Sequence, residues 1–290
     1  MKYLLLIFFS LLLLSSSVLD SPKLPKPFKK QFKFVPSGLS VVDGDTLSVQ
    51  AFYMLEHEVT NGEYKAFLES IRQENPEAFE EAKVQNEEWS KQLSSNFVGP
   101  MEEIYHIHES YTHYPVVNVT HKGAQLYCEW LEDKINKELL KSQKVEVRLP
   151  KKAEFIRAGA GNNYNWQYAW GNNKMTNSEG RYLCNFTRIP YASMSRGEND
   201  EIVVKDINLK IDYISEGTMF FAIKNSYYPN IYDIFNLNGN VAEWLSDSDD
   251  LAAGGSWRDF GYDVRLQSVK TYETASPMVG FRPVVSIVKD

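Results

Sequence analysis

The sequence predicts a single domain in which a few helices accompany a small amount of sheet and much irregular backbone. Clear helical spacing of apolar residues occurs in two places, after Thr60 and after Thr120. From Tyr164 onward the chain is rich in Asn, Gly and aromatic residues, with short apolar runs such as residues 284–288. Since no repeat of about 20 to 50 residues and no second linker divides residues 37–290, we expect one domain there.

The composition is that of a folded globular protein. The chain has 290 residues, of which 43% are hydrophobic and 24% charged. Its net charge of -7 argues against a nucleic-acid partner, because neutralising phosphates requires a surplus of Lys and Arg on one face. The two cysteines, Cys128 and Cys184, lack CxxC or Cys/His spacing and could form at most one disulfide.

The N-terminus has the layout of a secretory signal peptide. One lysine precedes an apolar run, Tyr3–Leu14, and small residues including Ser15 and Ser17 follow it. We therefore expect residues 1–17 to be a signal peptide and the protein to be exported: periplasmic, outer-membrane-associated or secreted. An uncleaved anchor is the alternative, disfavoured because the run is shorter than the roughly 20 apolar residues that a span needs.

Residues 18–36 are predicted to form a linker rich in Pro and Lys. The proline spacing favours an extended tether. The lysines could also bring the segment close to an anionic membrane surface. A solvated linker is the favoured interpretation, because the lysines are spread out.

The start signals of two helices can be read from the sequence. Thr60 and Glu63 form a capping box, which predicts a helix over Asn61–Gln73. A second helix is expected to begin after Thr120, with an apolar stripe that makes Cys128 a buried core thiol.

An acidic insertion over about residues 74–110 separates these helices, and residues 76–91 are expected to be partly helical. Such a surface is more often a solvated face than a docking site. His106, His108 and His113 follow at a spacing that invites a zinc interpretation. Hydrogen-bonded or surface histidines are favoured instead, because no cysteine lies nearby to complete a zinc ligand set.

Five short motifs follow one another in a fixed order and span most of the chain. They are Glu58–Tyr64 (EVTNGEY), Tyr114–Val119 (YPVVNV), Arg148–Phe155 (RLPKKAEF), Asn238–Trp244 (NGNVAEW), and Gly254–Trp257 (GGSW) closing with Gly280–Arg282 (GFR). Together they resemble the formylglycine-generating enzyme, or sulfatase-modifying factor, family over about residues 38–288. This resemblance implies a mixed α+β domain of the C-type-lectin-like kind, with calcium in structural sites.

The resemblance places one calcium ion on the turn at residues 236–243. Asn236 and Glu243 would supply side-chain oxygens, and Gly239 and Val241 main-chain carbonyls, which is the kind of oxygen set that calcium takes. The alternative is a glycine turn in which Glu243 is a cap or a salt-bridge partner. A second calcium site would use Asn185 and Phe186, with Asp212 as a third ligand in a stretch whose length departs from the family pattern.

The chemistry of the family is missing from this sequence. Family members that make formylglycine use two cysteines with copper and oxygen, and thiolates select Cu(I). Counted from the GGSW motif, those positions hold Asp259 and Val264, and the aromatic residue that often precedes the Glu-Trp pair is Ala242. Cys128 and Cys184 lie in other parts of the chain. We therefore expect no copper.

Two further features bear on chemistry. A related subgroup binds non-haem iron through a histidine cluster in an additional helical domain, but the five histidines here show no HxxxH pattern. Arg265 and Arg282, in the closing motifs, are predicted to be structural, since buried arginines commonly hold loops together through carboxylates and carbonyls.

Two functions remain. The first is a non-catalytic binding or scaffold module of the cell envelope, with envelope or secretion-system proteins as partners. It is similar to the gliding-motility and type IX secretion lipoproteins of Bacteroidetes, in which an insertion also ends in a Tyr/His-rich stretch such as 105–114, although no lipidation cysteine is present here. The second is an enzyme of altered, cysteine-independent chemistry that uses Asp259, Asp263 and Glu243 as acids.

Overall fold

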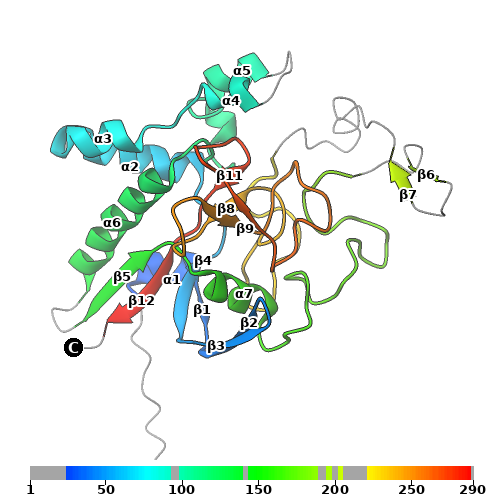
Figure 1. Ribbon diagram of the computed structural model, residues 1–290. Coiled ribbons are helices and arrows are strands. Elements are labelled where there is room, and N and C mark those ends of the chain that lie inside the picture. The colour runs from blue at the N-terminus through cyan, green and yellow to red at the C-terminus, as the bar shows by residue number, and fades with distance from the viewer. Residues whose placement is uncertain are drawn as a thin grey trace, which may run out of the picture.

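The computed structural model has a mixed architecture of helices, two small sheets and long loops (Figure 1). The residues that it describes are 24–92, 98–139, 143–188, 194–197, 202–204 and 221–288. Asp212 and the expected signal peptide lie outside these residues. The mixture of helix and sheet agrees with the α+β class expected from the sequence.

The main sheet has four antiparallel strands in the order β1-β4-β12-β5. Their bounds are β1 (Phe32–Val35), β4 (Phe52–Leu55), β12 (Val284–Val288) and β5 (Lys144–Arg148). All four residues of β4 are buried. Tyr53 and Leu55 pack into one hydrophobic cluster and Phe52 and Met54 into another. Because successive side chains of a strand point to opposite faces, this sheet is covered on both sides.

The second sheet carries two of the sequence motifs. Its order is β10-β9-β8-β11, with bounds β10 (Val269–Thr271), β9 (Leu251–Ala253), β8 (Ala242–Trp244) and β11 (Val279–Gly280). β11 runs parallel to β8, and the other pairs are antiparallel. The remaining strands form two hairpins, β2 (Gly38–Val42) with β3 (Asp45–Val49) and β6 (Met194–Arg196) with β7 (Ile202–Val204).

Helices cover the main sheet. α2 (Asn61–Glu74) and α6 (His121–Glu138) enclose one cluster against the sheet, and α7 (Lys152–Ala160) packs on the β2/β3 hairpin (Figure 1). The predicted capping box is confirmed: the Glu63 amide donates to Thr60 Oγ1 over 3.3 Å, and the Thr60 amide to Glu63 Oε2 over 2.9 Å. The second predicted helix start is confirmed as well, since Thr120 caps α6.

The chain before β2 differs from the extended linker expected over residues 18–36. Residues Lys26–Gln31 form helix α1, and β1 follows directly and pairs with β4. The reason is burial: Phe32 and Val35 are 2% and 0% exposed, so apolar residues between the lysines hold this segment on the core.

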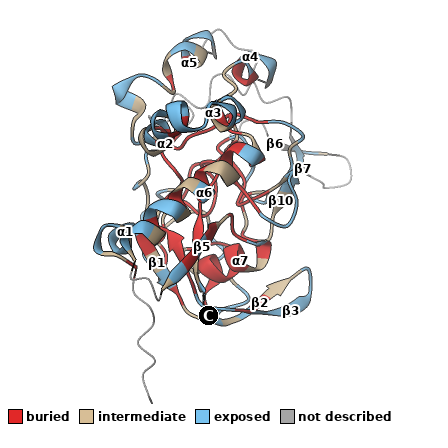
Figure 2. Ribbon diagram, turned by 90° about the vertical axis from the view of Figure 1, so that its left-hand side faces the viewer, coloured by how far each residue is buried: buried red, intermediate tan, exposed pale blue. Residues whose placement is uncertain are grey.

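The insertion is helical, as expected, and its inner side is part of the core. Its elements are α3 (Pro76–Ala82), α4 (Glu88–Gln92), α5 (Val98–Ile104) and the 3-10 helix η1 (Glu109–Tyr111). Trp89, Met101 and Tyr105 pack in one cluster with Val117 and Trp257. Figure 2 shows α5 largely exposed, whereas α7 is largely buried. No helix in the described part of the chain is long and apolar enough to cross a membrane.

Candidate functional site

The turn at residues 236–243 brings together residues of both predicted calcium sites. Asn236, Gly239 and Asn240 adopt left-handed backbone, with φ of 57°, 70° and 62°. A Cβ at Gly239 would lie 2.2 Å from the Asn185 carbonyl oxygen, so only glycine fits there. The Asn240 amide donates to that same oxygen over 2.8 Å. Asn185 is therefore joined to the turn, and its carbonyl already accepts a hydrogen bond.

Glu243 is buried and paired with Arg282. Arg282 Nε donates to Glu243 Oε2 over 2.9 Å, and Nη2 donates to Oε1 over 2.7 Å. Nη1 donates to the carbonyl of Leu55 over 3.0 Å, and Nη2 also donates to the carbonyl of Phe235 over 2.9 Å. Arg282 thus ties the main sheet, the 236–243 turn and β8 to one another, which is the structural role predicted for it.

Glu58 is a second buried carboxylate in this region that the sequence analysis did not single out. Its Oε1 accepts from Asn240 Nδ2 over 2.8 Å and its Oε2 from Asn236 Nδ2 over 3.2 Å. The pKa of Glu58 is raised to about 7, mainly by burial; Arg282 acts in the opposite direction and nearby Glu243 adds to the rise. The sequence signal that could have found this residue is its place as the first residue of the EVTN motif. Its hydrogen-bond partners lie more than 170 positions further along the chain, so no neighbouring residue indicated them.

The two side chains predicted to bind calcium, Asn236 and Glu243, differ in whether they are available to a metal ion. Asn236 Oδ1 is buried and has no hydrogen-bond partner among the described residues, and amide oxygens are calcium ligands. Glu243, the anionic ligand implied by the resemblance, instead has its charge compensated by Arg282. Asn236 Oδ1 is thus one oxygen available to calcium, whereas Glu243 is not available in this arrangement, and the site stays a prediction.

The second predicted calcium site is less complete. Phe186 packs in an apolar cluster with Tyr182, Cys184 and Val264. Asp212, the proposed third ligand, lies outside the described residues.

The two positions that correspond to the family's cysteine pair are both interior. Val264 is fully buried in the apolar cluster just described. Asp259 is 6% exposed; its Oδ2 accepts from the Ser256 amide (2.8 Å) and hydroxyl (2.7 Å), and its Oδ1 is bonded to Lys270. Asp259 and Glu243 thus each have a cation of their own.

Neither cysteine replaces the missing pair. Cys128 lies on α6 in the cluster under the main sheet, and Cys184 lies in the cluster around Val264. Burial raises the pKa of both thiols, so neither supplies a thiolate at neutral pH.

The histidines and Arg265 have separate structural partners. His106 Nδ1 lies 3.3 Å from Asn61 Oδ1, and His108 Nδ1 accepts from the Ser110 amide. No group of three His, Cys, Asp or Glu side chains in the described residues could hold a metal ion. Arg265 donates to the Tyr262 carbonyl over 2.8 Å and lies over the ring of that residue, which agrees with the structural role predicted for it.

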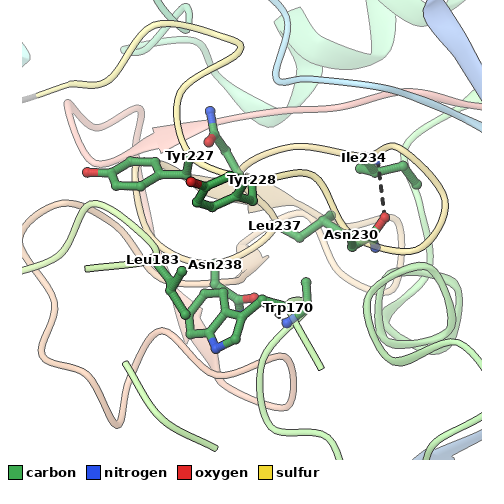
Figure 3. Close-up of a pocket in the computed structure, with 10 residues that line it drawn as sticks. Trp170, Leu183, Tyr227, Tyr228, Asn230, Ile234, Leu237 and Asn238 are labelled. Atoms are coloured by element: carbon green, nitrogen blue, oxygen red, sulfur yellow. Dashed lines mark hydrogen bonds between the residues drawn. The ribbon is translucent and has the colours of Figure 1, made fainter. Parts of the chain in front are cut away.

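A cleft opens beside the 236–243 turn, on loops that the sequence analysis left unassigned. Its outer part has a volume of about 510 Å³, and a narrow inner end of about 10 Å³ reaches Asn236. Figure 3 shows Trp170 and Leu183 on one side of the inner part and Tyr227 and Tyr228 on the other. None of the described residues that line the cleft carries a formal charge.

The chain matches the family model of the sulfatase-modifying factor enzyme 1-like domain over residues 37–287. It belongs to this family. The match covers the second sheet, the helical insertion, the Asn236–Glu243 turn and the main sheet apart from β1, so the family assignment expected from the five motifs is confirmed.

Curated relatives of the domain are formylglycine-generating enzymes. The enzyme of Thermomonospora curvata is 28% identical over 134 residues, which are 46% of this chain and 33% of that protein. The enzyme of Mus musculus is 23% identical over 223 residues, 69% of this chain and 50% of that protein. The chain therefore spans half or less of the length of these relatives.

Solved structures share the fold at low identity. CarF has a TM-score of 0.54 and 18% identity, covering 87% of this chain and 97% of its own. PvdO from Pseudomonas aeruginosa has a TM-score of 0.54 and 15% identity, covering 87% and 93%. Treponema denticola variable protein 1 has a TM-score of 0.53 and 17% identity, covering 87% and 94%. These likenesses concern the fold alone.

Proposed function

We propose that this protein is an exported, non-catalytic member of the sulfatase-modifying factor family that acts as a binding or scaffold module in the cell envelope. The observation that carries the proposal is the state of the two positions that correspond to the family's cysteine pair. Val264 is sealed in an apolar cluster and Asp259 is held by Ser256 and Lys270. An ion pair and a hydrocarbon side chain cannot exchange electrons with a thiol substrate.

The two thiols elsewhere support the same conclusion. Cys128 and Cys184 are each 2% exposed and lie in different hydrophobic clusters. A thiol acts as a nucleophile or as a copper ligand in its thiolate form, which burial disfavours at both positions. That neither thiol takes the place of the family's cysteine pair supports the non-catalytic role.

The proposed setting is the gliding-motility or protein-secretion machinery of the cell envelope. The leader-like segment 1–17 supports export. The helical insertion supports an interaction role, because its helix α5 is largely exposed (Figure 2). Asn61 Nδ2, at the start of α2, donates to the carbonyls of Tyr105 and Tyr111 over 3.1 Å each, which fixes the Tyr/His-rich stretch on the domain.

The catalytic half of the proposal is tested by incubating the purified protein with a sulfatase-derived cysteinyl peptide, copper and oxygen. Mass spectrometry should detect no loss of thiol and no aldehyde. A formylglycine-generating enzyme assayed in parallel is the positive control. Aldehyde formation by this protein would overturn the proposal.

The scaffold half is tested by proximity labelling in the native envelope, followed by pull-down with the purified domain. We expect the same envelope or secretion-system proteins in both experiments. Recovery should fall when the exposed side chain Ile107 of the insertion, which is 70% exposed, is replaced by Asp. A matched change at Val203, an exposed apolar residue of the β6/β7 hairpin, is the control. No enrichment above background in either experiment would refute the scaffold role.

A further inference from the structure

We infer that the cleft between Trp170 and Tyr228 is a binding site for a neutral saccharide. The inference deepens the proposed binding role and rests on it, because it names the class of ligand that this non-catalytic domain takes. Its outer volume of about 510 Å³ lies within the range of about 300 to 1,000 Å³ that is usual for small-molecule sites.

Charge narrows the ligand class. The outer cleft is lined by aromatic, aliphatic, amide and hydroxyl side chains: Ala169, Trp170, Asn172, Asn177, Ser178, Leu183, Tyr228, Pro229, Asn230 and Ile231. A charged ligand would lose hydration on entry and find no opposite charge among these residues. An uncharged ligand with both apolar and polar faces suits this lining.

The aromatic residues form two walls. Trp170 is held in place, because its ring stacks on Tyr168 with centroids 4.7 Å apart and its Nε1 donates to the Lys174 carbonyl over 2.8 Å. Tyr228, on the other side of the cleft, is 67% exposed (Figure 3). Rigid aromatic faces bury apolar area at little entropic cost and present a flat surface to the C–H faces of a sugar ring.

The amides supply fixed hydrogen-bond donors. Asn172 Oδ1 accepts from the Lys174 amide over 2.8 Å, and Asn177 Oδ1 accepts from the Arg181 amide over 2.9 Å, so both side chains are oriented. Within the described residues, neither Nδ2 group has a partner, which leaves each NH₂ to donate to a ligand hydroxyl. Asn230, by contrast, uses its oxygen and nitrogen on the backbone and serves as a wall.

The inner end of the cleft fixes where the ligand lies. Its volume of about 10 Å³ has room for a single water or ion beside the unpaired Asn236 Oδ1. The sugar rings therefore occupy the outer part, between Trp170 and Tyr228.

An extended peptide is the competing occupant, and the backbone around the cleft disfavours it. Peptides that add to a domain in extended form pair with an exposed strand edge. The residues lining this cleft lie in turns and irregular loops, and none belongs to a named strand. Recognition here must come from side chains, as it does for a saccharide.

The test is isothermal titration of the full chain with triacetylchitotriose, cellotriose, maltotriose and an uncharged decapeptide. We expect at least one trisaccharide to bind and the peptide not to bind. Trp170→Ala and Tyr228→Ala should each weaken binding at least tenfold, and Trp170→Phe should retain part of it. Tyr262→Ala, which removes a tyrosine of similar exposure (70%) outside the cleft, should leave binding unchanged.

Three results would overturn the inference: no binding of any trisaccharide at millimolar concentration, equal binding by the Tyr228→Ala variant, or binding of the peptide alone. Tyr228 is largely exposed, so its variant should fold even if Trp170→Ala does not. The outcome is separable from the proposed function. If no sugar binds, the results of the aldehyde assay and the envelope pull-down still stand. If the protein forms the aldehyde, the non-catalytic role is refuted, but saccharide binding in the cleft is not.

Discussion

Removal of Arg282 should be among the most damaging single changes in the molecule. The guanidinium is fully buried and donates to both oxygens of Glu243 and to the carbonyls of Leu55 and Phe235. In Arg282→Met, a side chain of similar length stays in place but Glu243 is left as a buried charge without a partner. Breaking a buried pair in this way typically costs about 3 to 5 kcal/mol of stability.

The reasoning also predicts how a second substitution acts. Glu243→Gln removes the charge that Arg282→Met leaves uncompensated, so the double variant should be less destabilised than the sum of the two single variants. Urea unfolding at pH 7, followed by circular dichroism, measures all three. Arg181→Met, which breaks an exposed pair with Glu179, is the control and should cost less than about 1 kcal/mol.

Two results would refute this account of the network. One is a loss below about 1 kcal/mol in Arg282→Met, which would mean that the buried charge is tolerated or solvated. The other is strict additivity in the double variant, which would mean that the two side chains do not act as a pair.

Three further outcomes are expected. Burial lowers the pKa of His106 to about 4, below its unfolded value of 6.5, so its contribution to stability is complete above pH 6.5 and is lost as the pH falls toward 4. The loss, up to roughly 3 kcal/mol, should be absent in His106→Phe. If urea unfolding gave the protein and this variant the same dependence of stability on pH, the prediction would be contradicted. Cys128 and Cys184 should react with Ellman's reagent only after unfolding, and rapid labelling of native protein would disprove their burial. Calorimetric titration of the metal-stripped protein should reveal calcium binding that Asn236→Ala weakens, and an identical titration of the variant would exclude this ligand.

Local signals predicted the elements that local interactions specify. The Thr60 and Glu63 capping box placed the start of α2 correctly, because cap and helix are made by neighbours in the chain. The strand β1 was missed for the opposite reason. Its lysines suggested a solvated linker, and the burial of Phe32 and Val35 depends on β4, nearly 20 residues further on.

The site shows the same division between local and distant interactions. The motif containing Gly239 identified a special turn, and the structure shows why no side chain fits there. A salt bridge of Glu243 was one alternative that the sequence left open, but its partner, Arg282, was not foreseen. The involvement of Glu58 was not foreseen, because its amide partners are brought near by the fold as a whole. The cleft was missed because Trp170 and Tyr228 belong to separate loops without a spacing pattern.

The position of β12 affects when the domain can form. This last strand lies between β4 and β5, so it joins the N-terminal part of the main sheet to the middle of the chain. Until residues 284–288 are present, β4 and β5 both have unpaired edges and Arg282 has not reached Glu243. A polypeptide that lacks residues 284–288 is therefore held back from its native state, and cooperative folding awaits the arrival of this strand.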